Sequence, residues 1–120
     1  MPVRSLNSPV LKWPDKETVD RALRLWAARQ VGLRPALKRL GYFGSYARGD
    51  WGVGSDLDLI AIVEHSPLPF EKRGLGWELE HLPVPAEILV YTTDEWFKMN
   101  NKAGKFIQVI YAETIWVHPS

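Results

Sequence analysis

The chain has 120 residues, a length typical of one domain, of which 46% are hydrophobic and 24% charged. This composition supports a buried core and excludes an intrinsically disordered chain. A formal net charge of +1 gives no broad electrostatic case for binding a long nucleic acid, so any anion would have to be bound locally. The sequence contains no cysteine, which excludes disulfides and thiolate metal sites and fits a cytoplasmic protein.

Residues 1–14 are punctuated by three prolines and are expected to form an N-terminal arm, followed by a single domain over 15–120. The N-terminus lacks the apolar run of a signal peptide, and the sequence has no stretch of eighteen consecutive apolar residues. We therefore expect no membrane-spanning segment.

The first predicted element is a helix that Asp15 caps and that extends through residue 30. Its apolar residues recur at helical spacing and share one face, at positions 19, 22, 23, 26 and 27. Gly32 and Pro35 are expected to end this helix.

Strands and helices alternate along the rest of the chain. The predicted strands cover 37–43, 57–63, 86–92 and 114–118, and the second is apolar on both faces, as in a central strand. The predicted helical segments cover 46–49, 70–82, a stretch capped by Asp94 and breaking near 100–101, and 104–112. Gly74 and Gly76 lower the helix propensity of the second. The alternation predicts an α/β fold of the α+β kind, a small mixed sheet flanked by helices.

Two aspartates stand at the start of the central predicted strand, in the sequence SDLDLIAIV. Side chains alternate across a strand, so Asp56 and Asp58 point to the same face. Two neighbouring carboxylates at a partly buried position repel each other unless a cation joins them. Magnesium prefers oxygen ligands and needs only one or two carboxylates together with substrate phosphates, so the pair predicts a magnesium site.

A third carboxylate, Glu87, breaks the apolar pattern of PAEILVY in the third predicted strand. If this strand lies beside the 57–63 strand, Glu87 can reach the aspartate pair and complete a three-carboxylate site. A salt bridge between Glu87 and a basic residue at a strand edge is an alternative that the sequence leaves open.

The pair Gly44-Ser45 ends the first predicted strand and begins a helical turn. Such a turn exposes backbone N–H groups that bind phosphate, and Ser45 adds a hydroxyl. If the 37–43 and 57–63 strands are antiparallel, Gly44-Ser45 faces Asp56 and Asp58 across a gap suited to a metal-bound triphosphate. The alternative for the two aspartates is a solvated turn, and for the nearby Arg48 an ion pair with Asp50 instead of a phosphate contact.

Other phosphate and metal motifs fail on the residues present. Gly44 and Gly49 have the spacing of a P-loop, but Asp50 follows where a lysine is required. The glycines at 49, 52 and 54 do not form a dinucleotide-binding fingerprint, and the aspartate pair lacks the third ligand and the glycine of a calcium loop.

A Gly-Ser pair is followed by ten residues and then by Asp-x-Asp at the start of an apolar strand. The order of these motifs resembles the signature of the polymerase-β nucleotidyltransferase superfamily. Within it, FGSYARG and SDLDLIAIV are similar to the minimal nucleotidyltransferases (MNT), and more distantly to the kanamycin nucleotidyltransferases. The motif core covers residues 42–63. The resemblance implies a polymerase-β-like fold.

This resemblance also implies roles for individual residues. Asp56 and Asp58 would ligate two Mg²⁺ ions with Glu87 as the third acid, which is one methylene longer than the family's usual aspartate. The residues implied to hold the triphosphate of ATP or another NTP are Gly44, Ser45, Arg48 and Ser55. The family further implies a small helical HEPN protein as partner, with the MNT protein acting as an antitoxin that transfers AMP to it.

The sequence therefore supports two functions of different classes. One is a magnesium-dependent transferase that moves a nucleoside monophosphate from an NTP to a hydroxyl acceptor on a partner protein, an RNA end or a small molecule. The other is a binding module, an antitoxin that acts by covering its partner with little or no catalysis. In a chain of 120 residues, few residues remain to enclose the substrate at the metal site once the sheet and its helices are built. A partner chain or a second copy in a homodimer is therefore expected to complete the pocket.

Overall fold

The structure is a computed structural model and describes residues 13–101 and 104–119. Most of the predicted arm, residues 1–12, lies outside this part, and the division into an arm and one domain stays a prediction. The elements, in chain order, are α1 (Lys16–Leu33), β2 (Leu37–Phe43), α2 (Ser45–Arg48), β3 (Leu57–Val63), the 3₁₀ turns η2 (Phe70–Lys72) and η3 (Leu79–His81), β4 (Ala86–Thr92), α3 (Thr93–Asn101), α4 (Lys105–Glu113) and β5 (Ile115–His118).

The four strands form one mixed sheet in the order β4-β3-β2-β5. β3 pairs parallel with β4 and antiparallel with β2, and β2 pairs antiparallel with β5. The predicted bounds of the first three strands agree with the structure, and the fourth begins one residue later than expected. The predicted mixed α/β fold is confirmed.

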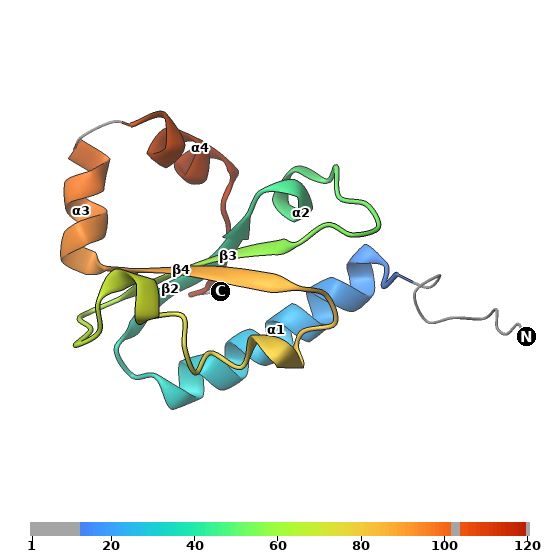
Figure 1. The fold of residues 1–120 in the computed structure, drawn as a ribbon, viewed down its shortest axis with the longest axis horizontal. Helices are drawn as coiled ribbons and strands as arrows, with labels where there is room; N and C mark the ends of the chain where they lie inside the picture. Colours follow the sequence, from blue (N-terminus) through green and yellow to red (C-terminus); the bar gives the residue numbers. More distant parts are fainter. Residues whose placement is uncertain (1–12, 102–103, 120) are drawn as a thin grey trace, which may run out of the picture.

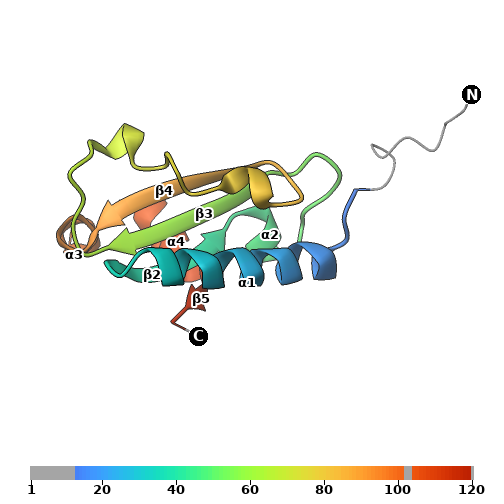
Figure 2. The ribbon, with the colours of Figure 1, turned by 90° about the horizontal axis from the view of Figure 1, so that it is seen from below.

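The helices cover both faces of this sheet, with α1 on one side and α3 and α4 on the other (Figures 1 and 2). β3 is buried on both faces, because Leu57, Leu59 and Ala61 face α1 while Ile60 and Ile62 face the α3–α4 side. This explains why its sequence is apolar without alternation.

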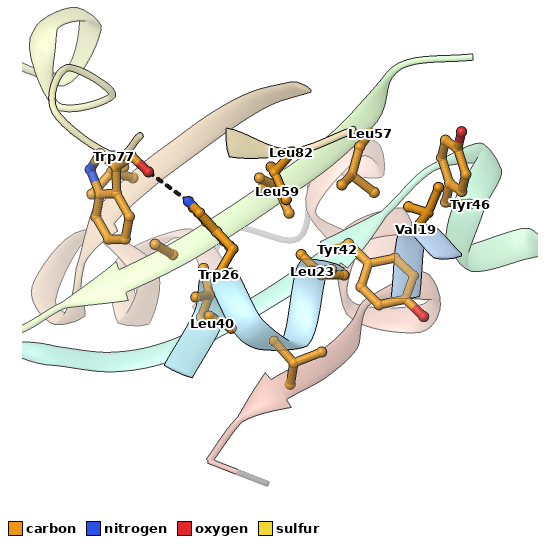
Figure 3. Close-up of a cluster of buried hydrophobic side chains, with 14 of the residues drawn as sticks. Val19, Leu23, Trp26, Leu40, Tyr42, Tyr46, Leu57, Leu59, Trp77 and Leu82 are labelled. Atoms are coloured by element: carbon orange, nitrogen blue, oxygen red, sulfur yellow. Dashed lines mark hydrogen bonds between the residues drawn. The ribbon is translucent and has the colours of Figure 1, made fainter. Parts of the chain in front are cut away.

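The larger core cluster lies between α1 and the sheet (Figure 3). Val19, Leu23 and Trp26 project from α1 onto it, as the helical spacing predicts. The indole N–H of Trp26 donates to the backbone carbonyl of Trp77 over 2.7 Å, which ties α1 to the segment between β3 and β4.

The α1 helix begins where predicted but ends later. The Asp15 side chain accepts from the backbone N–H of Thr18 over 2.8 Å, the expected N-cap bond. The helix runs through Gly32 to Leu33, so the prediction that Gly32 ends it is wrong. Arg34 instead forms the C-cap, its N–H donating to the carbonyl of Gln30. None of the helices described is both long and apolar enough to cross a membrane.

The helix predicted over 70–82 is not formed. The segment contains only the short turns η2 and η3, separated by Gly76 and Glu78 in the left-handed region (φ 80° and 58°). Left-handed residues interrupt the helical hydrogen-bond ladder, so no continuous helix can pass through them.

The start of α3 also differs from the prediction that Asp94 caps it. The Thr92 hydroxyl accepts from the N–H of Glu95 over 3.2 Å, and the Glu95 carboxylate accepts from the N–H of Thr92 over 2.9 Å. This reciprocal pair is a capping box, so Thr92 is the cap and Asp94 lies in the first turn.

A glycine in β2 allows β5 to approach closely. A Cβ at Gly41 would lie 2.7 Å from the carbonyl oxygen of Ile115 and 2.9 Å from side-chain atoms of Thr114 and Trp116. Only a residue without a side chain fits there, and the close contact fixes where the chain emerging from α4 meets β2.

Candidate functional site

The candidate site lies at the end of the sheet where β2 runs into α2 and β3 begins (Figure 1). Gly44 makes the turn with φ 78°, in a region that favours glycine. A Cβ at this position would collide with the Asp58 carboxylate. The carboxylate therefore packs directly against the glycine backbone, and the predicted Gly44–Asp58 approach is present because β2 and β3 are antiparallel, with Phe43 paired to Asp58.

The α2 turn and the loop after it are closed by local hydrogen bonds. Gly49 ends α2 in the left-handed conformation, with its N–H on the Ser45 carbonyl over 2.9 Å. The Ser55 hydroxyl accepts from the N–H of Gly52 over 2.8 Å, which closes the loop just ahead of Asp56. Ser55 thus stabilises the loop in this structure, and its predicted nucleotide contact stays a prediction.

Asp58 and Glu87 are direct neighbours in the parallel pairing of β3 with β4. Asp58 is half-buried, whereas Glu87 and Asp56 are exposed to solvent. The adjacency on which the prediction for Glu87 depended is therefore present.

The position of Asp58 disfavours the charged form of its carboxyl group. Burial raises its pKa above the usual value, and the negative charges of Glu87 and Asp56 raise it further, while Arg48 acts in the opposite direction. Asp58 thus lies within electrostatic reach of the other two predicted carboxylates. A bound cation is the general way in which such repulsion is relieved.

The donor set fits a hard divalent cation in its chemistry. All three side chains offer carboxylate oxygens, the ligands that Mg²⁺ prefers, and two of them are open to solvent, which leaves room for water and phosphate ligands. Among residues 13–101 and 104–119, however, no group of three or more histidine, cysteine or acidic side chains is close enough together to hold an ion by itself.

Arg48 is engaged in ion pairs in this structure. Its Nε donates to Asp50 over 3.1 Å and its Nη1 to Glu113 over 3.3 Å, and these carboxylates raise the arginine pKa. The pair with Asp50 is one of the two alternatives that the sequence leaves open for Arg48, whereas the pair with Glu113 is not indicated by the sequence.

Glu113 is the site residue that sequence reasoning missed. Its Oε1 accepts from the backbone N–H of Gly44 over 3.4 Å as well as from Arg48. The reason is tertiary: β5 pairs with β2 through Gly41–Trp116 and Tyr42–Ile115, and this pairing brings the end of α4, two residues before β5, close to Gly44 at the end of β2. Nothing in one sequence fixes that register, although an acid directly before the last strand was a visible signal.

Comparison with known proteins assigns the chain to a family. Residues 24–117 match the model of the nucleotidyltransferase domain, and the chain belongs to this family. The match includes β2, β3, β4 and all but the last residue of β5, and with them the Gly44–Asp58 contact and Glu87. Among curated proteins, none matches the sequence.

Two solved structures share the fold. One is a protein from Sulfolobus solfataricus described as a candidate nucleotidyltransferase, with a TM-score of 0.59 and 14% identity over 91% of this chain and 86% of that chain. The other is a toxin–antitoxin structure with AMP-PNP, with a TM-score of 0.54 and 16% identity over 89% of this chain and 75% of that chain. At these identities the likeness concerns the fold.

Proposed function

We propose that this chain transfers a nucleoside monophosphate, AMP, from ATP to a hydroxyl group, with Mg²⁺ bound by Asp56, Asp58 and Glu87. The observation that carries the proposal is the position of Asp58, which lies beside Glu87 and against the backbone of Gly44 in a chain of the nucleotidyltransferase domain family. One point of the sheet thus combines acidic side chains with a backbone turn suited to phosphate.

The chain's own groups would divide the work in the following way. The N–H of Gly44 and the hydroxyl of Ser45 would bind the triphosphate, with Arg48 released from its ion pairs to contact it. Glu87 would orient the acceptor hydroxyl and take its proton. The hydroxyl oxygen would attack the α-phosphorus in line, forming one P–O bond as the bond to the β-phosphate breaks and pyrophosphate leaves with the electron pair.

Magnesium ions held by Asp56, Asp58 and Glu87 would neutralise the charge of the triphosphate and of the departing pyrophosphate. The same ions would lower the pKa of the acceptor hydroxyl.

We propose that the acceptor is a hydroxyl on a partner protein of the HEPN type, with this chain as the antitoxin. The supporting observations are the resemblance of FGSYARG and SDLDLIAIV to minimal nucleotidyltransferases and the fold shared with a toxin–antitoxin structure that contains AMP-PNP. Exposed apolar side chains on α3 and α4, namely Phe97, Phe106, Val109 and Tyr111, offer a surface for such a partner. The same surface favours the second candidate function, a module that acts by binding alone.

The first experiment is calorimetric titration of ATP into the purified protein, with Mg²⁺ or with EDTA, for wild type and Asp56→Asn. The proposal expects binding that requires both the metal and Asp56. Glu64→Gln is the matched control, because it removes one negative charge from an exposed carboxylate just past the opposite end of β3, paired only with Lys38 in the described structure. Equal binding in EDTA, or unchanged binding by Asp56→Asn, would contradict the proposed site.

A transfer assay then separates the two functions. ATP labelled at the α-phosphate is incubated with the protein and a HEPN-type partner, and label on the partner is measured. An enzyme loses this label in Asp58→Asn. A binding module forms the complex equally well with Asp58→Asn and transfers nothing.

A further inference from the structure

In this structure, one carboxylate already accepts hydrogen bonds from two donors that the proposed function assigns to the triphosphate. Oε1 of Glu113 accepts from the N–H of Gly44 over 3.4 Å and from Nη1 of Arg48 over 3.3 Å. The Glu113 side chain is only 22% exposed, so its carboxylate lies against the protein and is not extended into solvent. Within the folded chain, Glu113 therefore takes the place of an anionic ligand.

The position of Glu113 is not one that its helix favours. It is the last residue of α4, where the unpaired carbonyls carry partial negative charge and a carboxylate is repelled. Its contacts with Arg48 and Gly44 offset that repulsion. A group held by those contacts is released when a stronger anion competes for the same donors.

The Glu113 carboxylate can leave its donors without a movement of α4. The helix itself is held by buried Ile110, by Phe106 edge-on to Phe43 and by Tyr111 stacked on Trp96. Glu113 is joined to this backbone by a flexible side chain, and rotamers exchange rapidly at partly exposed positions. A rotation of that side chain would withdraw the carboxylate and leave the N–H of Gly44 and the guanidinium of Arg48 available.

We propose that Glu113 is an internal competitor of the nucleotide: its carboxylate holds the N–H of Gly44 and the guanidinium of Arg48 until a triphosphate displaces it, so that it sets the affinity for NTP. This inference rests on the proposed nucleotide site and adds a residue that weakens binding there.

The test compares wild type with Glu113→Gln, Glu113→Asp and the charge-matched control Glu64→Gln. Glutamine keeps the size and removes the charge, and aspartate keeps the charge but is too short to reach both donors. Each protein is titrated calorimetrically with ATP and Mg²⁺, and separately with inorganic tripolyphosphate. Thermal unfolding checks that each variant is folded, and either Glu113 variant alone suffices for the comparison.

We expect Glu113→Gln to bind both ligands about three- to tenfold more tightly than wild type, the range for releasing one or two partly exposed charge-assisted hydrogen bonds. The affinity of Glu113→Asp should lie between those of wild type and Glu113→Gln, and the affinity of Glu64→Gln should equal that of wild type. Unchanged or weaker binding in every Glu113 variant that folds overturns the inference and leaves the proposed function intact where wild type binds ATP.

The proposed nucleotide site can also fail while the role of Glu113 as a competitor is supported. Tighter tripolyphosphate binding by Glu113→Gln, without ATP binding by any protein, supports the competitor and contradicts the nucleotidyltransferase site. Binding of neither ligand by any protein overturns both.

Discussion

Asp58 lies directly beside Glu87 in the parallel pairing of β3 with β4, and its carboxyl is partly buried there. Burial, Glu87 and Asp56 together raise the pKa of Asp58, so its charged form is penalised in the folded chain without a cation. The arrangement costs the protein stability, as is common where a site is built for a ligand.

Replacing Asp58 by asparagine should therefore stabilise the metal-free protein. The expected gain at neutral pH is about 0.5 kcal/mol, a small value because the carboxylate is still partly open to solvent. The sign follows from the raised pKa: the penalty exists above the folded pKa and disappears as the pH falls through it. Urea unfolding of both proteins at pH 7 and near pH 4 measures this, and a variant less stable than wild type at pH 7 would contradict it.

Gly44→Ala should be more damaging than Gly49→Ala, although both glycines have positive φ (78° and 87°). The new Cβ at Gly44 meets the Asp58 carboxylate, whereas nothing lies within 4 Å of a Cβ at Gly49. We expect Gly49→Ala to lower the free energy of unfolding by about 1 kcal/mol, from strain in the left-handed conformation. Gly44→Ala should lower it by about 1–3 kcal/mol more, because the new Cβ overpacks the site and because ψ of −152° at Gly44, against 8° at Gly49, is a conformation open almost only to glycine.

Chemical denaturation of the two variants measures how much each substitution lowers the free energy of unfolding. Asp58→Ala provides a further control, because it removes the colliding carboxylate while the strain at Gly44 stays. Gly44→Ala should cost less in the Asp58→Ala background than in wild type. Equal costs in the two backgrounds would show that the collision is not the cause.

Glu78 should make folding sensitive to acid. Its carboxylate accepts two bonds from Arg29, over 2.7 and 3.0 Å, and one from buried Gln30 over 2.9 Å, which lower its pKa from 4.5 to about 2. A depressed carboxyl pKa stabilises the fold above the unfolded value, and this stability is lost as the pH falls from about 4.5 towards about 2.

The free energy of unfolding of wild type and Glu78→Gln, measured at pH 7, 4 and 3, checks this expectation. Wild type should be the more stable at pH 7, and the difference should shrink in acid. Asp20→Asn is a suitable control, since Asp20 pairs with Arg24 on the exposed face of α1. A difference between wild type and Glu78→Gln that is constant with pH would contradict the assignment.

Trp26→Phe should destabilise the core by about 1–3 kcal/mol, beyond the smaller volume of the ring. The substitution removes the indole N–H and leaves the buried carbonyl of Trp77 without this donor (Figure 3). Trp116→Phe is the comparison, because Trp116 is only partly buried beside the opposite cluster. Equal losses in urea unfolding would show that volume, and not the hydrogen bond, decides.

Much of the fold follows from local sequence patterns. The apolar run of β3, the spacing of Val19, Leu23 and Trp26, and the cap at Asp15 depend on neighbours in the chain, so they predict the elements closely. The segment 70–82 was predicted wrongly because its left-handed residues, Gly76 and Glu78, are held by contacts with α1 and its end, such as the Arg29–Glu78 pair.

The acidic pair, the Gly-Ser turn and the strands that carry them could be predicted from short stretches of the chain, because a strand's alternation and a glycine's freedom are local properties. That Glu87 lies beside Asp58 and that Glu113 reaches Gly44 became visible only in the folded chain. Both depend on strand order and register, which are set by burying whole faces of the sheet against α1, α3 and α4. Such packing is a property of the complete chain and leaves no short motif in the sequence.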